Sequence, residues 1–465
     1  MKKMSIVLSV FVLLSILLSA CTTPATTEAP VVDEPTEEVV AEEPTEEVTE
    51  EPAAPAFEGV TVQFWHVYSD APGEGLQALV DEFNATNEYG ITVEALNQGG
   101  YSDVEDKINA GIQSGDLPDV VMAYTNTLTD WHSVGYIADL NPYVSDAEYG
   151  LTAEQLADIY PHLVTAGSTP DGAWIAYPMT QSANVLVYNF TWAEELGFAA
   201  APTTSEELKE QVCAAAAANT EIGGDYAGTG GLIYYPSSTN LLHFLYAFGG
   251  NELNADGTAY DFTSQAMIDT AMFILDLKEN GCVWQTESYP NPEQAQRKAL
   301  ITMSSTAGAP YYAAAFEDAG NTTDVWGWIA APGPDGTLAV DAFQQMLGVV
   351  PSTPEQEMAS WLFVKWLTSP EIQARWVQIS GYYGTQYTTE ALLADYGAAN
   401  PVWASGVALA AIGPAEPQTF PAWTSVRRIL GDMAAELYNA TDEAGVLAIL
   451  TDYTSQANEL VTEIQ

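Results

Sequence analysis

The feature that most constrains the fold of this 465-residue chain is a regular alternation of strand-like and helix-like patterns at residues 60–124. Short β-branched and aromatic runs alternate with segments whose apolar residues recur at helical spacing, as at Leu76, Val80 and Phe83. The order strand, helix, strand, helix, strand is typical of a parallel sheet with helices on its faces. The expected strands are residues 60–67, 91–96 and 120–124, and the expected helices are residues 73–84 and 104–112.

The same mixture of patterns continues to the C-terminus. About four hundred residues of this kind exceed one ordinary domain, so the sequence predicts two α/β lobes. Further strands are expected at residues 184–188, 299–304 and 325–330. Further helices are expected at residues 205–218, 240–248, 266–280, 292–300, 354–368, 370–380, 426–440 and 444–463.

The N-terminus has the pattern of an export signal. Two lysines precede an apolar run at residues 6–18 that is too short to span a bilayer comfortably. The sequence Leu18-Ser19-Ala20-Cys21 resembles the lipobox of bacterial lipoproteins, whose cysteine is acylated after cleavage. We therefore expect a signal peptide at residues 1–20 and a lipid on Cys21 that anchors the exported protein to the outer face of the cell membrane. A plain secretory signal with an accidental cysteine is the alternative.

Residues 21–57 form a segment of different composition. It contains repeated Glu-Pro-Thr-Glu-Glu units, eleven acidic residues, no basic residue and no aromatic residue before Phe57. Such a segment cannot bury enough apolar surface to offset its ordering entropy, so we expect it to be disordered. We interpret it as a tether between membrane and globular body, although an incidental low-complexity tail would have the same composition.

The formal net charge of −52 excludes several partners. Nucleic acids and anionic lipids need clustered cations, and this chain has only 11 Lys and Arg residues against 63 Asp and Glu. Acidity also disfavours a strongly anionic ligand, although one buried arginine would weaken that argument. With 47% hydrophobic residues, the chain can still form large cores.

Two cysteines remain once Cys21 is assigned to the lipid. Cys213 lies in an expected helix and Cys282 lies just beyond another. In an exported protein, such a pair is expected to form a disulfide, and two buried free thiols are the alternative.

The order of motifs resembles the family 1 extracellular solute-binding proteins of ABC transporters, over nearly all of residues 59–465. Each motif is weak alone, and their order and spacing together make the resemblance specific. The motifs are Val62-Gln63-Phe64-Trp65-His66, Leu79-Val80-Asp81-Glu82-Phe83-Asn84, Gly100-Tyr101, Gly115-Asp116-Leu117-Pro118-Asp119-Val120, the segment 135–143, Val185 to Asn189, Trp361 to Pro370 and Arg375 to Gly384.

The resemblance implies an α/β fold of the class II periplasmic-binding type, with two lobes, hinge strands and an interlobe cleft. The expected N-terminal lobe comprises residues 58–182 and about 329–368, and the expected C-terminal lobe comprises residues 183–328 and about 369–465. The implied function is to capture a ligand by hinge closure and present it to ABC permease subunits in the membrane. The implied protein is a monomer and not an enzyme.

The ligand that this resemblance favours is a mono- or oligosaccharide. Sugar-binding members use aromatic faces against the apolar faces of the ring, with amides and carboxylates for the hydroxyl groups. The scarcity of cations favours a neutral sugar, whereas Gly100-Tyr101 and Arg427 match glycerol-phosphate binders. A glycan-active enzyme and a sensor lipoprotein are the alternatives from other classes.

Candidate ligand-binding residues follow from strand ends, from a helix start and from the resemblance. Trp65, His66 and Tyr124 end strands, where ligands bind in open α/β sheets. The segment before the helix near Pro310 offers backbone N–H donors. Gln344 and Gln345 are expected to supply amides from a returning strand. The other candidates are Tyr101, Ser305, Thr306, Gly308, Tyr311, Tyr312, Tyr382, Tyr383 and Arg427.

No motif indicates a metal, a cofactor or a catalytic group. The four histidines have no metal-ligand spacing, and Cys213 and Cys282 have no CxxC partner. The acidic loop at residues 254–261 lacks the glutamate that an EF-hand requires. The glycine-rich segment at residues 223–231 is not followed by Gly-Lys-Ser, so there is no P-loop.

Overall fold

The structure, a computed structural model, describes residues 56–286, 289–410 and 416–463. Its first part confirms the predicted parallel sheet. Strand β1 (Thr61–His66) pairs in parallel with β2 (Thr92–Asn97) on one side and β3 (Val120–Tyr124) on the other. The helices α1 (Asp70–Thr86) and α2 (Tyr101–Ser114) connect these strands.

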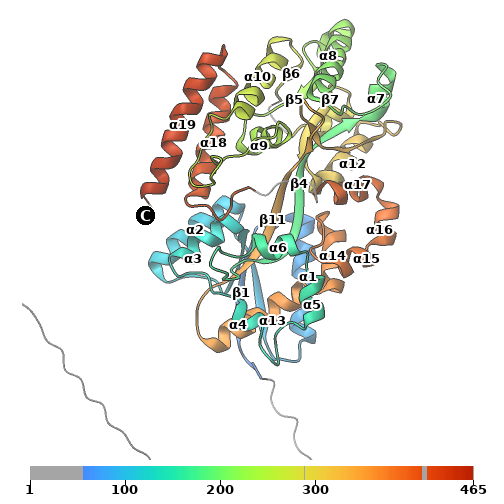
Figure 1. The fold of residues 1–465 in the computed structure, drawn as a ribbon. Coiled ribbons are helices and arrows are strands. Elements are labelled where there is room, and N and C mark those ends of the chain that lie inside the picture. The colour runs from blue at the N-terminus through green and yellow to red at the C-terminus, as the bar shows by residue number, and fades with distance from the viewer. Residues whose placement is uncertain (1–55, 287–288, 411–415, 464–465) are drawn as a thin grey trace, which may run out of the picture. The chain divides into compact units, whose positions relative to one another are not determined.

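Two long antiparallel strands join this sheet to the second half of the protein (Figure 1). Strand β11 (Asp341–Val349) pairs with β3 on one side and with β4 (Tyr177–Asn189) on the other, and its register against β4 shifts between Gln345 and Met346. Beyond that contact, β4 pairs with β7 (Ala299–Ser305) and β8 (Trp326–Ile329). One sheet therefore runs through both lobes in the order β2-β1-β3-β11-β4-β7-β5-β6.

The core of the first lobe lies between its sheet and the helices α1, α13 (Pro354–Leu367) and α14 (Pro370–Ser380). The ring of Phe363 on α13 lies 5.5 Å from that of Phe64 and 5.4 Å from that of Phe83. Trp376 on α14 belongs to the same buried cluster. The packing of the first lobe thus includes the chain up to about Ser380, beyond the expected boundary near residue 368. Its smaller helices are α3 (Thr125–Ser133), α4 (Asn141–Val144), α5 (Ala153–Asp158) and α6 (Pro161–Ala166).

The second lobe buries a larger core beneath its part of the sheet. The last two helices, α18 (Trp423–Leu437) and α19 (Glu443–Glu463), pack on α9 (Ser238–Ala247) and α10 (Gln265–Glu279) and close this core. Its other strands are β5 (Gly230–Ile233) and β6 (Val283–Trp284), with the small pair β9 (Ala331–Pro332) and β10 (Leu338–Ala339). Its other helices are α7 (Phe190–Glu195), α8 (Ser205–Ile222), α11 (Asn291–Ala295) and α12 (Ala309–Asp318), with 3-10 turns at Gly224–Tyr226 and Thr306–Gly308.

The structure differs from the sequence prediction in several places. The helix expected at residues 292–300 ends with Ala295, because the apolar residues after it join β7 and pair with β4. The strand expected at residues 184–188 is one end of β4, which is thirteen residues long. The strand expected to carry Gln344 and Gln345 is β11, whose bounds were not predicted. The helices α15 (Tyr387–Leu392), α16 (Ala394–Ala399) and α17 (Pro401–Ala410) were not predicted.

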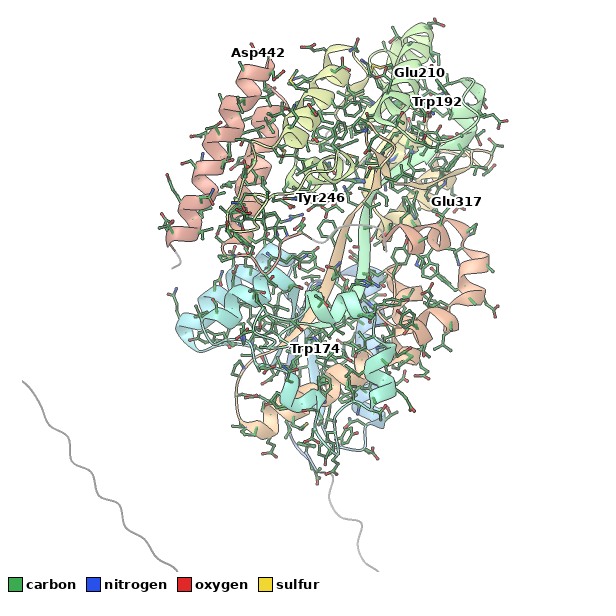
Figure 2. All side chains as sticks on the ribbon, viewed as in Figure 1. Trp174, Trp192, Glu210, Tyr246, Glu317 and Asp442 are labelled. Atoms are coloured by element: carbon green, nitrogen blue, oxygen red, sulfur yellow. A yellow bond between two sulfur atoms is a disulfide. The ribbon has the colours of Figure 1, made fainter. Side chains whose placement is uncertain are left out.

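The distribution of side chains explains how so acidic a chain folds (Figure 2). Glu210 on α8, Glu317 on α12 and Asp442 just before α19 are exposed, whereas Trp174 and Trp192 are buried. Exposed carboxylates keep their hydration, so their repulsion is weakened by solvent.

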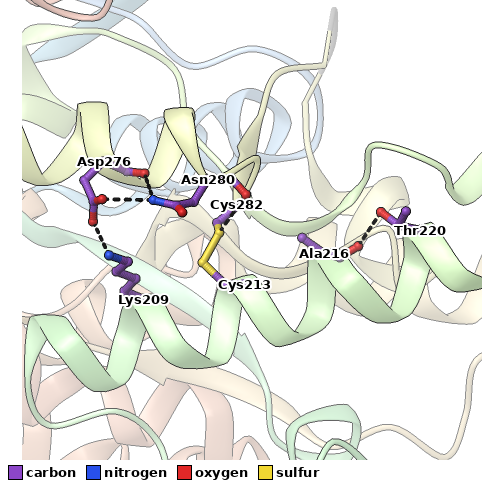
Figure 3. The surroundings of a disulfide bond; sticks show 7 residues. All are labelled: Lys209, Cys213, Ala216, Thr220, Asp276, Asn280 and Cys282. Atoms are coloured by element: carbon purple, nitrogen blue, oxygen red, sulfur yellow. Dashed lines mark hydrogen bonds and ion pairs between the residues drawn. A yellow bond between two sulfur atoms is a disulfide. The ribbon is translucent and has the colours of Figure 1, made fainter.

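A disulfide links Cys213 on α8 to Cys282, which lies just before β6 (Figure 3). For these two cysteines the sequence analysis expected a disulfide and kept two buried free thiols as the alternative. An ion pair of 2.5 Å between Lys209 and Asp276 lies next to it and also joins α8 to α10. The cysteines are 69 residues apart, and a cross-link over a loop of this order typically stabilises a domain by about 2–4 kcal/mol.

Candidate functional site

A cleft of about 680 Å³ lies on one face of the β4–β11 pair, between the two lobes. Helix α2, strand β3 and helix α3 form its wall in the first lobe, and α18 and the start of α9 form its wall in the second. Its lining residues are Tyr101, Ser102, Glu105, Ala123, Tyr124, Asn126, Thr127, Ser182, Asn184, Pro236, Ser237, Ser238, Thr239, Ser305, Phe343, Gln345, Tyr382, Glu416, Gln418, Thr424, Arg427, Arg428 and Gly431.

Tyrosines form one side of this cleft. The rings of Tyr101 and Tyr124 lie 4.3 Å apart and are tilted by 31° to each other. The ring of Tyr382 lies 6.2 Å from that of Tyr68, which is buried behind it. Burial raises the pKa of Tyr101, Tyr124 and Tyr382, so these hydroxyl groups stay protonated near neutral pH. The result is a neutral aromatic surface that suits the apolar faces of a ligand.

The amide of Gln345 fixes the base of the cleft. Its Oε1 accepts hydrogen bonds from the hydroxyls of Tyr68 at 2.6 Å and Thr180 at 2.5 Å. This side chain is therefore held in place by Thr180 of β4 and by Tyr68, which lies in the segment between β1 and α1.

The pleat of β4 and β11 decides which of their polar residues face the cleft. Phe343 pairs in register with Ser182, and both line the cleft together with Gln345. Because successive side chains in a strand point to opposite faces, Gln344 lies on the other face of the sheet. That face carries a second cavity of about 890 Å³, which includes Gln181 and Tyr383 in its lining.

The two cations that line the cleft are already paired with carboxylates. Arg427 donates from Nε to both oxygens of Glu416 at 2.9 Å and from Nη2 to Thr239 at 2.7 Å. Arg428 donates to Glu105 at 2.6 Å. The guanidinium carbon of Arg427 also lies 5.6 Å from the centre of the Phe343 ring. A strongly anionic ligand would have to compete with these carboxylates.

Helix α18 contacts the first lobe across the mouth of the cleft. The hydroxyl of Thr424 donates to Asp130 at 2.6 Å and accepts from the amide of Asn126 at 2.8 Å. The ion pair of Arg428 with Glu105 on α2 lies beside these bonds. The lobes are therefore in direct polar contact on this side of the cleft.

The cleft brings together some of the residues predicted from the sequence. They come from both lobes and from the strands between them. They are Tyr101, Tyr124, Ser305, Gln345, Tyr382 and Arg427.

Several other predicted residues are buried in the protein interior and do not line the cleft. Trp65 is 8% exposed within a hydrophobic cluster of the first lobe. His66 accepts the backbone N–H of Tyr68 at 3.2 Å, and burial lowers its pKa to about 4. Thr306 accepts the backbone N–H of Ala183 at 3.1 Å.

The remaining predicted residues also lie outside the cleft lining. Tyr312 is buried and its hydroxyl bonds that of Thr302 at 2.7 Å, whereas Tyr311 is 63% exposed beside a different small pocket. Gly308 ends a 3-10 turn, with Ser304 close to where its side chain would be. Gln344 and Tyr383 face the opposite side of the sheet from their neighbours Gln345 and Tyr382. Cys21 lies outside the described residues.

Sequence reasoning missed most of the polar lining, including Asn184, Thr239 and Glu416. One signal was present. Strand β4 is buried along its whole length, yet it carries the polar run Thr180-Gln181-Ser182 and then Asn184. Polar side chains in a buried strand need partners, which makes such a run a marker for an internal cleft.

Neither a metal centre nor a membrane span is found in the part of the chain that the structure describes. There, no cluster of three or more His, Cys, Asp or Glu side chains is placed to hold a metal ion. None of the helices described is both long and apolar enough to cross a bilayer.

Comparison with known sequences gives a family match over most of this chain. The family described as bacterial extracellular solute-binding protein matches residues 78–411. An uncharacterized lipoprotein in the oleD 5' region of Streptomyces antibioticus is 31% identical over 140 residues. That match covers 29% of this chain and only 28% of the relative.

Solved structures share the fold. The cyclic α-maltosyl-1,6-maltose binding protein of Arthrobacter globiformis matches with a TM-score of 0.69 and 21% identity, over 87% of this chain and 98% of that one. The sugar-binding protein MalE of Xanthomonas citri matches with a TM-score of 0.72 and 18% identity, over the same shares of 87% and 98%. UgpB of Mycobacterium tuberculosis, solved with glycerophosphocholine, matches with a TM-score of 0.69 and 18% identity, again over 87% and 98%. These matches establish the two-lobed α/β fold.

Proposed function

The chain belongs to the bacterial extracellular solute-binding protein family, and we propose that it captures an uncharged saccharide in the cleft between its lobes and delivers it to an ABC permease. The observation that carries the proposal is the lining of the cleft. Neutral tyrosines lie along one side, and amides and hydroxyls such as Asn184 and Ser182 lie along the base. Sugars present apolar C–H faces and hydroxyl groups, which match these two kinds of surface.

The charged residues of the cleft favour a neutral saccharide over a phosphate ester. Glycerophosphocholine bound to UgpB makes a phosphodiester the second candidate. In this protein, however, Arg427 and Arg428 are each bonded to a carboxylate, so a phosphate would have to displace Glu416 or Glu105. We therefore favour the neutral saccharide.

A ligand panel tests the proposal. We expect maltose, maltotriose or a cyclic oligosaccharide to raise the melting temperature of the purified protein, and glycerophosphocholine to have little effect. Replacing Tyr124 with Ala should weaken the binding of the responding sugar by about tenfold or more, because a central aromatic contact is typically worth more than 1 kcal/mol. Isothermal titration calorimetry measures this change.

Tyr311→Ala is the matched control, because Tyr311 is exposed and lies outside the cleft lining. We expect this variant to bind the sugar as the wild type does. Binding of glycerophosphocholine with no response to any sugar would contradict the neutral ligand. Hydrolysis of a bound oligosaccharide would contradict a role in binding alone.

We also propose that the protein is held at the outer face of the cell membrane by a lipid on Cys21. The lipobox sequence supports this location, as does the lipoprotein description of the Streptomyces relative. Mass spectrometry of the protein extracted from membranes should find a mature N-terminus at acylated Cys21. An unmodified Cys21, or cleavage at another residue, would overturn the anchor and leave the ligand assignment untouched.

A further inference from the structure

Three buried carboxyl groups lie beside the cleft and share one guanidinium. Glu252 is 3% exposed, Asp341 is 0% exposed and Glu416 is 5% exposed, and the cation among them is Arg427. We call Glu252, Asp341 and Glu416 the acid cluster. Three buried negative charges against one positive charge would be very costly, so part of the cluster must carry protons.

The hydrogen-bond donors around the acid cluster bind Glu416 and Glu252. Glu416 accepts from Nε of Arg427 and from the indole N–H of Trp423 at 3.0 Å. Glu252 accepts from the hydroxyl of Tyr246, a residue labelled in Figure 2. Glu416 is thus bound as a carboxylate is, whereas Asp341 receives none of these donors.

The strand neighbour of Asp341 does not supply a donor either. Asn184 pairs with Asp341 in register, but its amide N–H groups are directed at Asn240 and His243, each at 3.2 Å. The other ring nitrogen of His243 lies 3.1 Å from the carbonyl of Ala339, to which it donates, so the imidazole is neutral. Neither carboxyl oxygen of Asp341 accepts a hydrogen bond from an N–H or O–H group of the described residues.

A proton on Asp341 would explain how its buried carboxyl group is stable without a hydrogen-bond donor. Glu416 lies close enough to Asp341 to raise the pKa of Asp341 both by its charge and as a hydrogen-bond partner. A protonated Asp341 can donate its O–H to Glu416, which satisfies both groups and removes one charge. Burial raises the pKa of Asp341 well above its usual range, and the charge of Glu416 raises it further, while Arg427 acts in the opposite direction.

We infer that Asp341 is a positioning residue, which carries a proton, donates it to Glu416 and so holds Glu416 and Arg427 in the arrangement that lines the cleft. The inference rests on the proposed function, because it takes this cleft as the ligand site. When Asp341 loses its proton, it repels Glu416 and competes for Arg427, so the wall of the cleft is disturbed. Ligand affinity should therefore fall as the pH rises through the titration of Asp341.

The other titratable groups that face this pair come from every element packed around it. They are Arg427 from α18, Tyr124 from β3, Tyr246 from α9 and Glu252 from the segment after α9. Burial raises the pKa of Glu252 to about 7, so it can also titrate within the physiological range. A variant of Asp341 itself is therefore needed to assign the proton.

Asp341→Asn is that variant, because an amide donates a hydrogen bond and cannot ionise. For the wild type, we expect the affinity for maltotriose, or for another panel sugar that binds, to fall by about tenfold or more as the pH is raised from neutral into the alkaline range. In Asp341→Asn, this pH dependence should be lost. Asp341→Ala, which removes the donor, should bind more weakly than Asp341→Asn at every pH.

Asp119→Asn is the matched control. Asp119 is a half-buried carboxyl whose pKa is raised by burial, but it bonds the backbone of Gln63 in the first lobe and lies outside the cleft lining. We expect it to keep the pH dependence of the wild type. If Asp341→Asn keeps that dependence as well, the inference is wrong.

Infrared spectroscopy tests the proton without any ligand. Glu252→Gln serves as the reference protein, because it removes the other buried carboxyl of the acid cluster, whose pKa is raised to about 7. At neutral pH this reference should show the carbonyl stretch of a protonated carboxyl group, and adding Asp341→Asn should reduce that band, with circular dichroism checking that both variants are folded. An unchanged band after adding Asp341→Asn to the folded reference would overturn the inference. If no panel sugar binds but the band is reduced as expected, the proposed function fails and the assignment of the proton stands.

Discussion

Replacing Asp324 with Ala should lower the free energy of unfolding by about 3–5 kcal/mol, the usual cost of removing one partner of a buried ion pair. The side chain of Asp324 is 0% exposed and bonds Arg297 at 2.5 Å and 2.8 Å. It also accepts the amides of Asn189 at 2.8 Å and Asn321 at 2.9 Å. Arg297 has a left-handed backbone, with φ of 58°, in the turn between α11 and β7. Through Arg297 and Asn189, Asp324 therefore links this turn to the end of β4.

The effect of pH on this contact follows from the direction of its pKa shift. Burial tends to raise the pKa of Asp324, but the bonds from Arg297, Asn189 and Asn321 outweigh it and lower the pKa to about 2. A carboxyl with a lowered pKa stabilises the folded state above its usual value of 3.8, and this stabilisation is lost as the pH falls toward 2. The stability difference between wild type and Asp324→Ala should therefore shrink below about pH 4.

Glu195→Ala is the matched control for this prediction. Glu195 bonds the same arginine at 2.6 Å, but its side chain is 55% exposed. Such a surface contact contributes about 0–1 kcal/mol. Urea unfolding of both variants measures the contrast, and equal losses of stability would contradict the importance given to burial.

The second large effect is expected for Arg427→Met. Methionine fills much of the volume of the arginine but leaves Glu416 and its neighbours in the acid cluster without their counter-charge. We expect a loss of about 3 kcal/mol in the free energy of unfolding and loss of sugar binding, because buried carboxylates would then be uncompensated. The pKa values of Asp341 and Glu252, which Arg427 lowers in the wild type, should rise in this variant. The destabilisation should be largest at high pH and become smaller as the pH falls and the carboxyls are protonated.

The neighbouring residue provides the control for stability. Arg428 also lies on α18 and also forms an ion pair, with Glu105, but its side chain is 62% exposed. Arg428→Met should change the free energy of unfolding by less than about 1 kcal/mol. Thermal and urea unfolding between about pH 5 and about pH 9 cover the range in which buried carboxyls titrate. A loss in Arg428→Met as large as that in Arg427→Met would contradict this account.

The sequence was sufficient to predict the first sheet, because local patterns decide it. Strands and helices alternate there, and connection rules leave few arrangements for a chain of that kind. The extent of strand β11 escaped prediction because its apolar run is interrupted by Asp341, Gln344 and Gln345. These polar residues are stable in a strand because β4 and the cleft lie beside them. Such partners are distant in the sequence, so a local pattern does not indicate them.

The candidate site was predictable only in part for a similar reason. Tyr124 was found because the carboxyl end of a parallel strand is a general ligand position. The neighbours Gln344 and Gln345 could not be separated, because a shift of one residue exchanges the two faces of a strand. Glu416 and Thr239 precede or begin helices far from β3 in the sequence, and only the assembled second lobe places them in the cleft.

The register shift of β11 has a mechanical consequence. An inserted residue increases local twist and weakens the ladder at one point, so a strand bends there more easily than elsewhere. In this protein the inserted residue is Met179 of β4, opposite Gln345 and Met346 of β11, and Gln345 also forms the base of the cleft. A ligand that contacts Gln345 would therefore lie directly beside the bend in the pair of strands that joins the two lobes.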